Sequence, residues 1–302
     1  MIDEILLPQR LDVLKTLRSM SGNYGWLLRL LRRRQERSGH FPNRLHKILL
    51  RCVPKRRPYF IGETRHGVRF LGDIREYDSV HWAVGAQSDE RLIDLACEQL
   101  NARPGAYLDV GANCGVVAAT VALRCPAVRG IVAFEPVPAT AARCAATFAL
   151  NGLDRARLFQ VAVGETDGEI VIYEKPGHSG GASALPNRDT SAARVPCCTL
   201  DTLRPRLEVG RVSLIKVDVE GFEPQVLRGA ARWLASDRPV VLYEYNERAL
   251  QAGWSIETMN NLLRAAGRYD FTGLRADGAR LPILSGLGNA ASNHLDVLCV
   301  PV

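Results

Sequence analysis

From Tyr107 to the end of the chain, short apolar segments alternate with longer segments of helical character. Apolar strands separated by helices form a mostly parallel sheet, with the helices covering both faces. The sequence therefore predicts an α/β fold of this kind. The expected strands are 106–110, 130–135, 156–164, 212–218, 239–245 and 294–300, and the expected helices are 116–123, 138–152, 224–235 and 256–267. A hairpin is expected around 168–175, followed by a glycine- and serine-rich loop over 175–187.

The size of the chain leaves room for a smaller unit beside the main core. With 302 residues and 47% hydrophobic content, it exceeds the typical domain of about 100–150 residues. We expect a basic helical extension over 1–58 and a main domain over 59–302, in which 59–104 supply a hairpin and a helix. No segment approaches the roughly 18 consecutive apolar residues of a membrane span, and the chain opens on acidic residues where a secretion signal would carry bases. The expected compartment is the cytoplasm.

The eight cysteines are scattered and include no CxxC pair. This pattern indicates neither a zinc site nor a disulfide framework, so reduced and mostly buried thiols are expected.

The basic residues are concentrated near the start of the chain. Residues 10–57 carry a net charge of +12, and the rest of the chain carries −5. Two apolar patterns with helical spacing lie in this segment. Their members are Trp26, Leu27, Leu30 and Leu31, and then Leu45, Ile48, Leu49 and Cys52. We favour helices that pack on the main domain or on a second subunit. The alternative is a basic amphipathic surface that contacts anionic lipid at the inner face of the membrane.

The segment "YLDVGANCGVVAAT", residues 107–120, joins an expected strand to an expected helix through two glycines. Gly111 permits a sharp turn, and Gly115 lets the helix begin close to the sheet, with backbone N–H groups facing a ligand. Glu135 closes the next strand, 20 residues after Gly115. A carboxylate at that strand end can accept hydrogen bonds from both hydroxyls of a ribose. The glycine turn and Glu135 together predict a ligand that contains a nucleoside.

The composition of the turn distinguishes between two such ligands. A dinucleotide fingerprint has a glycine where this chain has Asn113, because the backbone must approach a pyrophosphate there. Asp109 adds a carboxylate that repels a pyrophosphate and attracts a cationic amino or sulfonium group. The turn therefore favours S-adenosylmethionine over a nicotinamide dinucleotide.

Several motifs in one order resemble the FkbM-type methyltransferases, which methylate hydroxyl oxygens on sugars and polyketides with S-adenosylmethionine. They are "YLDVGANCG", "FEPVP", "VAVGETDGEIVIY", "SGGAS", "CCTLDTL", "LIKVDVEGFEPQVLRGA" and "RPVVLYEYN", which together span residues 107–246. The resemblance implies a Rossmann-like class I methyltransferase fold, with a seven-stranded, mostly parallel sheet and an antiparallel last strand.

The resemblance also implies a set of cofactor-binding residues. The turn would line the methionine and ribose side, Glu135 would bind the ribose, and the end of the third strand would flank the adenine. The implied residues are Asp109, Val110, Gly111, Ala112, Asn113, Gly115, Glu135, Pro136, Val161, Ala162 and Asp218.

The segment "LIKVDVEGFEPQ" supplies the candidate catalytic groups. It ends a strand expected beside the first one, so Lys216, Asp218 and Glu220 should reach the same cleft. Asp218 or Glu220 could accept the proton of an acceptor hydroxyl, and Lys216 could orient the acceptor. The alternative is an ion pair that only locks the strand end.

Two further residues are weaker candidates. His178 lies in the expected glycine- and serine-rich loop and could act as a general base, although an isolated histidine in such a loop is more often only exposed. Glu244 closes the expected strand 239–245 and could face the acceptor or cap backbone. No spacing of histidines and acids indicates a metal, so none is predicted, but the carboxylates of Asp218, Glu220 and Glu244 leave a metal-assisted reaction open.

The sequence thus predicts an S-adenosylmethionine-dependent O-methyltransferase. Its expected acceptor is a saccharide, with a polyketide or a lipid-linked glycan as the alternatives, and a homo-oligomer remains open. No nucleic acid partner is expected. A nicotinamide-dependent oxidoreductase and a catalytically weak nucleoside-binding module are the competing functions.

Overall fold

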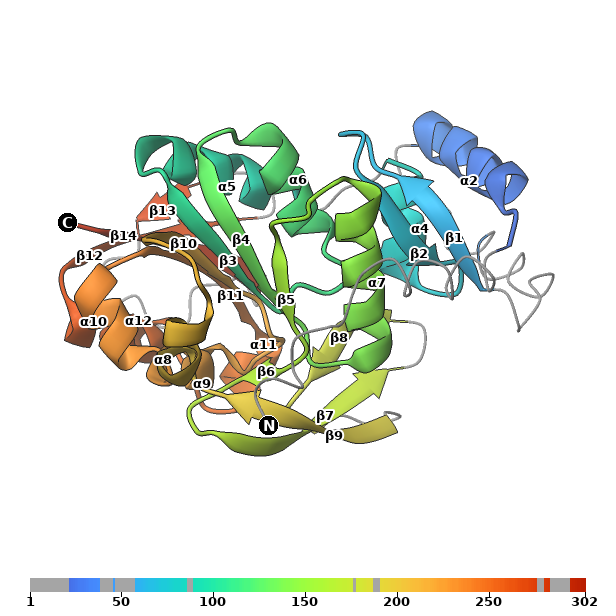
Figure 1. Cartoon of the computed structure of the whole chain (residues 1–302). Coiled ribbons are helices and arrows are strands. Elements are labelled where there is room, and N and C mark those ends of the chain that lie inside the picture. Colours follow the sequence, from blue (N-terminus) through green and yellow to red (C-terminus); the bar gives the residue numbers. More distant parts are fainter. Residues whose placement is uncertain are drawn as a thin grey trace.

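The computed structural model describes residues 22–38, 46, 58–85, 89–175, 178–186, 191–275, 280–282 and 294–302 (Figure 1). Within these residues, one large mixed sheet forms the centre of the molecule, with helices on both of its faces.

The strand order of this sheet is β13-β12-β14-β11-β10-β3-β4-β5. The bounds are β3 Gly105–Val110, β4 Val128–Phe134, β5 Arg157–Phe159, β10 Val212–Val217, β11 Val240–Asn246, β12 Tyr269–Leu274, β13 Arg280–Pro282 and β14 His294–Pro301. Five neighbouring strands from β5 to β11 are parallel, whereas β14 is antiparallel to both β11 and β12. The expected α/β fold with a mostly parallel sheet and an antiparallel last strand is confirmed. The resemblance implied seven strands, and the described residues form eight; β12 and β13 are the two that were not among the strands expected from the sequence.

Successive side chains of the central strands point to opposite faces and build two cores. On one face, Tyr107 and Ala133 pack with α5 Glu90–Ala102, α6 Val116–Arg124 and α7 Pro138–Leu150. On the other, Leu108 and Val132 pack with α9 Glu223–Arg228, α10 Ala231–Asp237 and α12 Ile256–Ala266. Shorter helical segments are α8 Leu200–Leu203, η3 Arg204–Arg206 and α11 Glu247–Gln251.

The expected helix over 224–235 is two helices, α9 and α10. Gly229 lies between them, and a Cβ on Gly229 would lie 1.9 Å from the carbonyl oxygen of Gly164. This close approach of two backbones interrupts the helix at the glycine.

A second sheet, β6-β9-β7-β8, is inserted between β5 and β10. Its strands are β6 Ala162–Val163, β7 Gly168–Lys175, β8 His178–Ser183 and β9 Ser191–Cys198. The expected strand 156–164 is therefore divided, because β5 pairs with β4 and β6 pairs with β9. The expectation of a loop over 175–187 is wrong for β8, which pairs with β7. Gly180 suits this strand because a Cβ there would lie 2.8 Å from Asp78 Oδ2.

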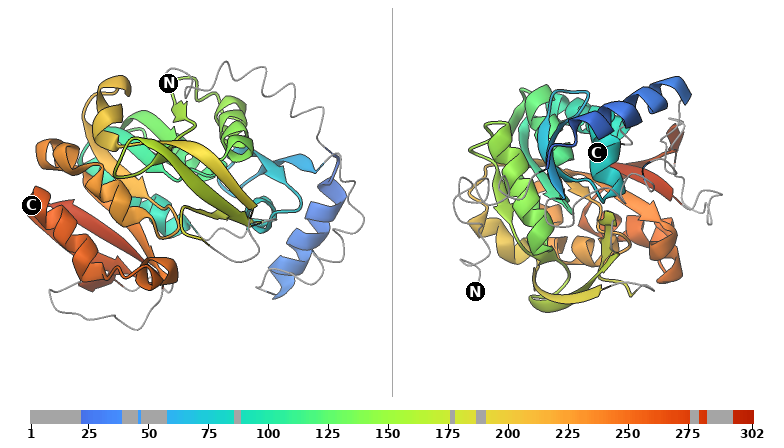
Figure 2. Two further views of the ribbon diagram at one scale, coloured as in Figure 1. Left: turned by 90° about the horizontal axis from the view of Figure 1, so that it is seen from below. Right: turned by 90° about the vertical axis from the view of Figure 1, so that its right-hand side faces the viewer.

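A smaller layer precedes α5 in the chain. It contains the hairpin of β1 Tyr59–Glu63 and β2 Arg69–Asp73, followed by α4 Tyr77–Ala83, which the sequence did not predict. The helix α2 Gly25–Ser38 lies beside this hairpin (Figure 2). Leu27 and Leu31 of α2 are buried there, whereas Trp26 and Leu30 are 53% and 44% exposed.

The apolar pattern of residues 24–37 thus belongs to a helix, as expected. The second pattern, Leu45, Ile48, Leu49 and Cys52, lies outside the described residues, and the boundary near residue 58 stays a prediction. None of the helices in the described part of the chain has the length and apolar character of a membrane span. All seven described cysteines are buried free thiols.

Candidate active site

A cavity of about 410 Å³ opens at the carboxyl ends of β3, β4 and β10. The chain order of the sheet reverses between β3 and β10, and ligands of open α/β sheets bind at such a point. α4 and β8 line the opposite side of the cavity. Most of the predicted site residues line it, namely Val110, Gly111, Ala112, Asn113, Glu135, Pro136, Val161, Ala162, Lys216, Asp218 and Glu220.

Three predicted residues have a different position. Asp109 and Gly115 do not line the cavity. Asp109 is fully buried, and Gly115 is the residue just before α6. His178 begins β8, and its side chain lies outside what the structure describes.

The turn between β3 and α6 requires its glycines. Gly111 has φ +80°, and a Cβ on it would lie 1.8 Å from the carbonyl oxygen of Asp218. The N–H groups of Gly111 and Ala112 both donate to the carbonyl oxygen of Phe134, at 3.0 Å. The expectation that the N–H groups of this turn face a ligand is wrong for these two, because they bind the turn to β4.

Glu135 lies at the end of β4 and is 6% exposed. Its Oε2 accepts the N–H of Asn113 and its Oε1 accepts the N–H of Val137, both at 3.0 Å. Burial raises the pKa of Glu135 to about 7, although these two hydrogen bonds favour the ionised form. A carboxylate oxygen can accept about two hydrogen bonds, so each oxygen retains an acceptor position.

Lys216 is buried and connects two carboxylates. Its Nζ lies 3.1 Å from Asp109 Oδ1 and 3.3 Å from Asp218 Oδ2. Burial opposes the charge on this ammonium, but the neighbouring carboxylates of Asp109 and Asp218 outweigh burial and raise the pKa of Lys216. The ion pair that the sequence left as an alternative is therefore present. Asp218 is the partner that faces the cavity.

A group of acids lines the cavity beyond Asp218. Glu244 on β11 pairs across the sheet with Asp296 on β14, and Glu220 lies on the loop after β10. Burial, together with the charges of Asp218, Glu220 and Glu223, raises the pKa of Glu244 to about 10. Burial and Asp218 raise the pKa of Asp296 to about 7. Asp296 was missed in the sequence, although it and Glu244 occupy expected strands; only the sheet order shows that these strands are neighbours.

α4 supplies aromatic residues that the sequence did not single out. Tyr77, His81 and Trp82 line the cavity, and the rings of Tyr77 and His81 stack with centroids 5.1 Å apart. Burial lowers the pKa of His81, and Asp78 partly opposes this. Glu76, just before α4, pairs with Arg143 of α7 and accepts a hydrogen bond from Ser179 of β8 at 3.1 Å. These contacts fix α4 beside the cavity.

Comparison with known proteins identifies the class of enzyme. The family described as the Methyltransferase FkbM domain matches residues 109–269, which is more than half of the chain. The chain belongs to the FkbM methyltransferase family. The match begins at Asp109, next to the last residue of β3, and it includes Glu135, Lys216 and Asp218. It leaves α2, the β1–β2 hairpin and α4 outside.

One curated relative of this FkbM chain is the 2-O-methyltransferase NoeI of Sinorhizobium fredii. The two are 28% identical over 162 residues, which cover 48% of this chain and 65% of NoeI. This chain thus spans just under two thirds of the length of that relative.

Two of the solved structures to which this chain is similar are described as methyltransferases. The methyltransferase FkbM of Methylobacillus flagellatus is 12% identical, with 72% of this chain and 52% of that chain covered and a TM-score of 0.44. The SAM-dependent methyltransferase of Agrobacterium tumefaciens is 13% identical, with 81% and 71% covered and a TM-score of 0.44.

S-adenosylmethionine is the cofactor of an FkbM methyltransferase, and the cavity fits it. Glu135 offers two buried carboxylate oxygens with free acceptor positions, and Phe134, Val161 and Ala162 form an apolar wall next to it. The acids at the other side of the cavity suit a cationic sulfonium group.

Proposed function

We propose that this chain is an O-methyltransferase that transfers a methyl group from S-adenosylmethionine to a hydroxyl of a saccharide. The observation that carries the proposal is the division of one cavity into two sides. The side with Gly111 and Glu135 suits a nucleoside, and the other side joins the acids Asp218 and Glu220 to the rings of Tyr77 and His81. A polyhydroxyl acceptor offers many donors to such acids, and the curated relative is named a 2-O-methyltransferase.

The cofactor supplies a methyl group on a positively charged sulfur. In the proposed reaction, Glu135 binds the ribose hydroxyls, and Val161 and Ala162 flank the adenine. Asp218 and Glu220 are placed to accept the proton that the acceptor hydroxyl loses. Lys216 is buried in its ion pairs, so it positions Asp218 instead of contacting the acceptor.

The competing oxidoreductase function is not favoured. A nicotinamide dinucleotide needs backbone N–H groups directed at its pyrophosphate, and those of Gly111, Ala112 and Asn113 donate within the protein.

Two measurements test the proposal. Calorimetry should detect binding of S-adenosylhomocysteine and no binding of NAD, and methyl transfer from labelled S-adenosylmethionine should occur with members of a saccharide panel. Binding of NAD in place of S-adenosylhomocysteine would overturn the methyltransferase function. Transfer to polyketide hydroxyls alone would replace the saccharide with the other acceptor class, and binding without any transfer would favour a nucleoside-binding module.

We further propose that α2 holds the enzyme reversibly at an anionic membrane surface, where a lipid-linked glycan would be its acceptor. The exposed Trp26 and Leu30 lie on the same helix as the exposed arginines Arg29, Arg33, Arg34 and Arg37, which supports this partner. A homo-oligomer through the same face is the alternative.

A further inference from the structure

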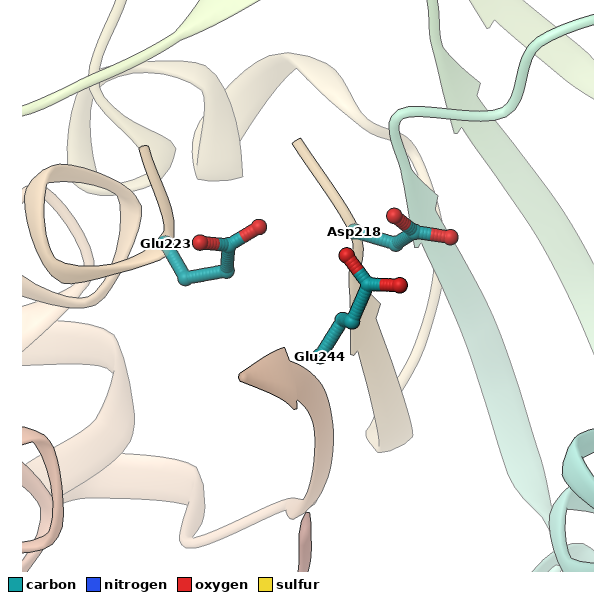
Figure 3. Close-up of side chains that lie close together, drawn as sticks. All are labelled: Asp218, Glu223 and Glu244. Carbon is teal, nitrogen blue, oxygen red and sulfur yellow. The ribbon is translucent and has the colours of Figure 1, made fainter. Parts of the chain in front are cut away.

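Three carboxyl groups converge at the acidic side of the cavity. One oxygen from each of Asp218, Glu223 and Glu244 lies within 4.8 Å of the other two. Figure 3 shows the three side chains close together, with the Asp218 carboxyl group turned away from Glu223. Carboxylates at this spacing repel each other, so they require protons or a cation between them. Lys216 is shared between Asp109 and Asp218, so its single charge already balances two carboxylates.

Glu223 gives a second and independent indication of a ligand. Its side chain is fully buried, and its Oε1 accepts the N–H groups of Val219 and Gly221 at 2.9 and 3.2 Å. Its Oε2 is also buried and has no hydrogen-bond partner among the described residues. Its carboxyl group is directed toward Asp218 and Glu244 (Figure 3). A buried oxygen without a partner is costly and therefore indicates a group that the protein binds.

We propose that Asp218, Glu223 and Glu244 bind a hard divalent cation of the Mg²⁺ or Mn²⁺ class. All three offer oxygen ligands, which such ions prefer. An ion that holds its ligands at about 2.0–2.1 Å joins oxygens up to about 4 Å apart, and the three oxygens, all within 4.8 Å of one another, reach this spacing with a small rotation of their side chains. The ligand Glu244 is itself held, because Asn246 Nδ2 donates to its Oε2 at 2.7 Å.

The position of the cluster assigns the ion a role, which rests on the proposed O-methyltransferase function. Asp218 and Glu244 line the cavity, whereas Glu223 does not. The ion therefore has a protein ligand on its buried side and open positions toward the cavity. Two adjacent hydroxyl oxygens of a saccharide can fill those positions, and the ion then orients and polarises the hydroxyl that receives the methyl group. With Asp218 bound to the ion, Glu220 is left to accept the proton.

Binding of Mn²⁺ to the full chain, without any acceptor, tests the site. After treatment with a chelator, the protein should bind one Mn²⁺ per chain by calorimetry and by electron paramagnetic resonance, and Mg²⁺ should displace it. Glu244→Gln and Glu223→Gln should each weaken binding by at least about tenfold, since loss of even indirect support for a ligand costs roughly 10- to 100-fold. Glu165→Gln is the matched control, because Glu165 is an exposed carboxylate paired with Arg228 outside the cavity.

Two outcomes would overturn the site. One is the absence of saturable Mn²⁺ binding by the wild type. The other is an equal affinity for Mn²⁺ in the wild type, Glu244→Gln and Glu223→Gln, provided that circular dichroism shows the variants to be folded. Protons shared among the three carboxyls would then replace the ion. Undiminished methyl transfer by chelator-treated enzyme would overturn the role toward the acceptor while leaving the O-methyltransferase function intact. If the proposed O-methyltransferase function itself were wrong, the wild-type protein would not bind S-adenosylhomocysteine, which is a separate measurement.

Discussion

At the scale of single residues, Glu135 connects the turn to the cofactor side of the cavity. Its two oxygens accept backbone N–H groups and retain acceptor positions toward the cavity. Glu135→Ala should weaken binding of S-adenosylhomocysteine by about 1.5–3 kcal/mol, the amount expected for lost charge-assisted hydrogen bonds. Calorimetry measures this, with Glu169→Ala on the exposed side of β7 as the control. Unchanged affinity in folded Glu135→Ala would remove Glu135 from the cofactor site.

The same residue makes the stability of the ligand-free protein depend on pH. Burial raises the pKa of Glu135 from 4.5 to about 7. Between these values the folded protein retains a proton that the unfolded chain has released. The free energy of unfolding should therefore fall as the pH rises through this window, by up to about 1.4 kcal/mol per pH unit for this group. Urea denaturation at pH 5, 6 and 7 should show a smaller fall in Glu135→Gln than in the wild type, and identical slopes would contradict the assignment.

Asp218 is the residue at which the reaction should be most sensitive. It faces the cavity beside Lys216, and both of its proposed roles, proton acceptor and cation ligand, need its charge. Asp218→Asn keeps the shape and removes the charge, so turnover should fall by about 100-fold or more, while the affinity for S-adenosylhomocysteine changes little. Asp94→Asn, at an exposed ion pair with Arg124, is the control. Near-normal turnover in Asp218→Asn would leave Asp218 with a structural role only.

At the scale of elements, most strands and helices of the main sheet were predictable because their apolar periodicity is strong, but β12 and β13 were not expected. The family and its cofactor followed from the motifs around Gly111 and Asp218, and both expectations are confirmed. The roles of individual site residues stay predictions. β8 was missed because its glycines and serines carry no apolar alternation, and its pairing depends on contacts with β7 and α4. The seven-residue α4 is too short for a clear period, so Tyr77 and His81 could not be placed.

The cluster of Asp218, Glu223 and Glu244 illustrates the same limit. Asp218 directly follows β10, Glu223 begins α9 and Glu244 lies in β11, and each acid has an ordinary local explanation in the sequence. Their proximity depends on the parallel pairing of β10 with β11 and on the loop that turns Glu223 back toward the strand ends. Only the assembled sheet shows that these carboxyls meet.

The helix α2 should bind anionic vesicles if its exposed face is a membrane surface. Each accessible Lys or Arg adds about 1 kcal/mol near such a surface, and Trp26 can insert. Wild-type protein should sediment with anionic but not with neutral vesicles, and higher salt or Arg33→Glu with Arg37→Glu should reduce this. Arg32 is spared because it donates to the carbonyl oxygen of Ala83 at 2.6 Å.

The control for this experiment reverses the same number of charges on the main domain, with Arg129→Glu and Arg155→Glu, both at exposed positions. Failure of the wild type to sediment with anionic vesicles at low salt would exclude a membrane as the partner of α2. An equal loss of vesicle binding in the control variant would show that only the net charge of the protein matters. A concentration-dependent dimer that Trp26→Ser dissolves would assign the face to a second copy of the chain.

At the scale of the whole molecule, the layer before α5 stabilises the fold and also completes the cavity. Leu27 and Leu31 of α2 share one buried cluster with Phe60 and Phe70 of the hairpin and with Val80 of α4. The helix that contributes Tyr77 and His81 to the cavity is therefore supported by α2, although α2 does not line the cavity. The same cluster also reaches Cys114 and Val116, at the start of α6. We expect the acceptor side to depend on α2 more than the cofactor side does, because hydrogen bonds to β4 and Glu135 hold Gly111 and Asn113 without any contribution from α2.

Leu27→Ala combined with Leu31→Ala tests this dependence. Truncation of a buried leucine typically costs about 2–5 kcal/mol, so the double variant should unfold at a clearly lower urea concentration. At temperatures where it remains folded, its turnover should fall severalfold, while its affinity for S-adenosylhomocysteine stays near that of the wild type. Trp26→Ala with Leu30→Ala, on the exposed face of the same helix, is the matched control and should leave stability and turnover in solution unchanged.

Equal losses of cofactor affinity and turnover in the Leu27 and Leu31 variant would show that α2 supports the whole fold without a particular effect on α4. Unchanged stability would show that α2 is only loosely attached to the hairpin.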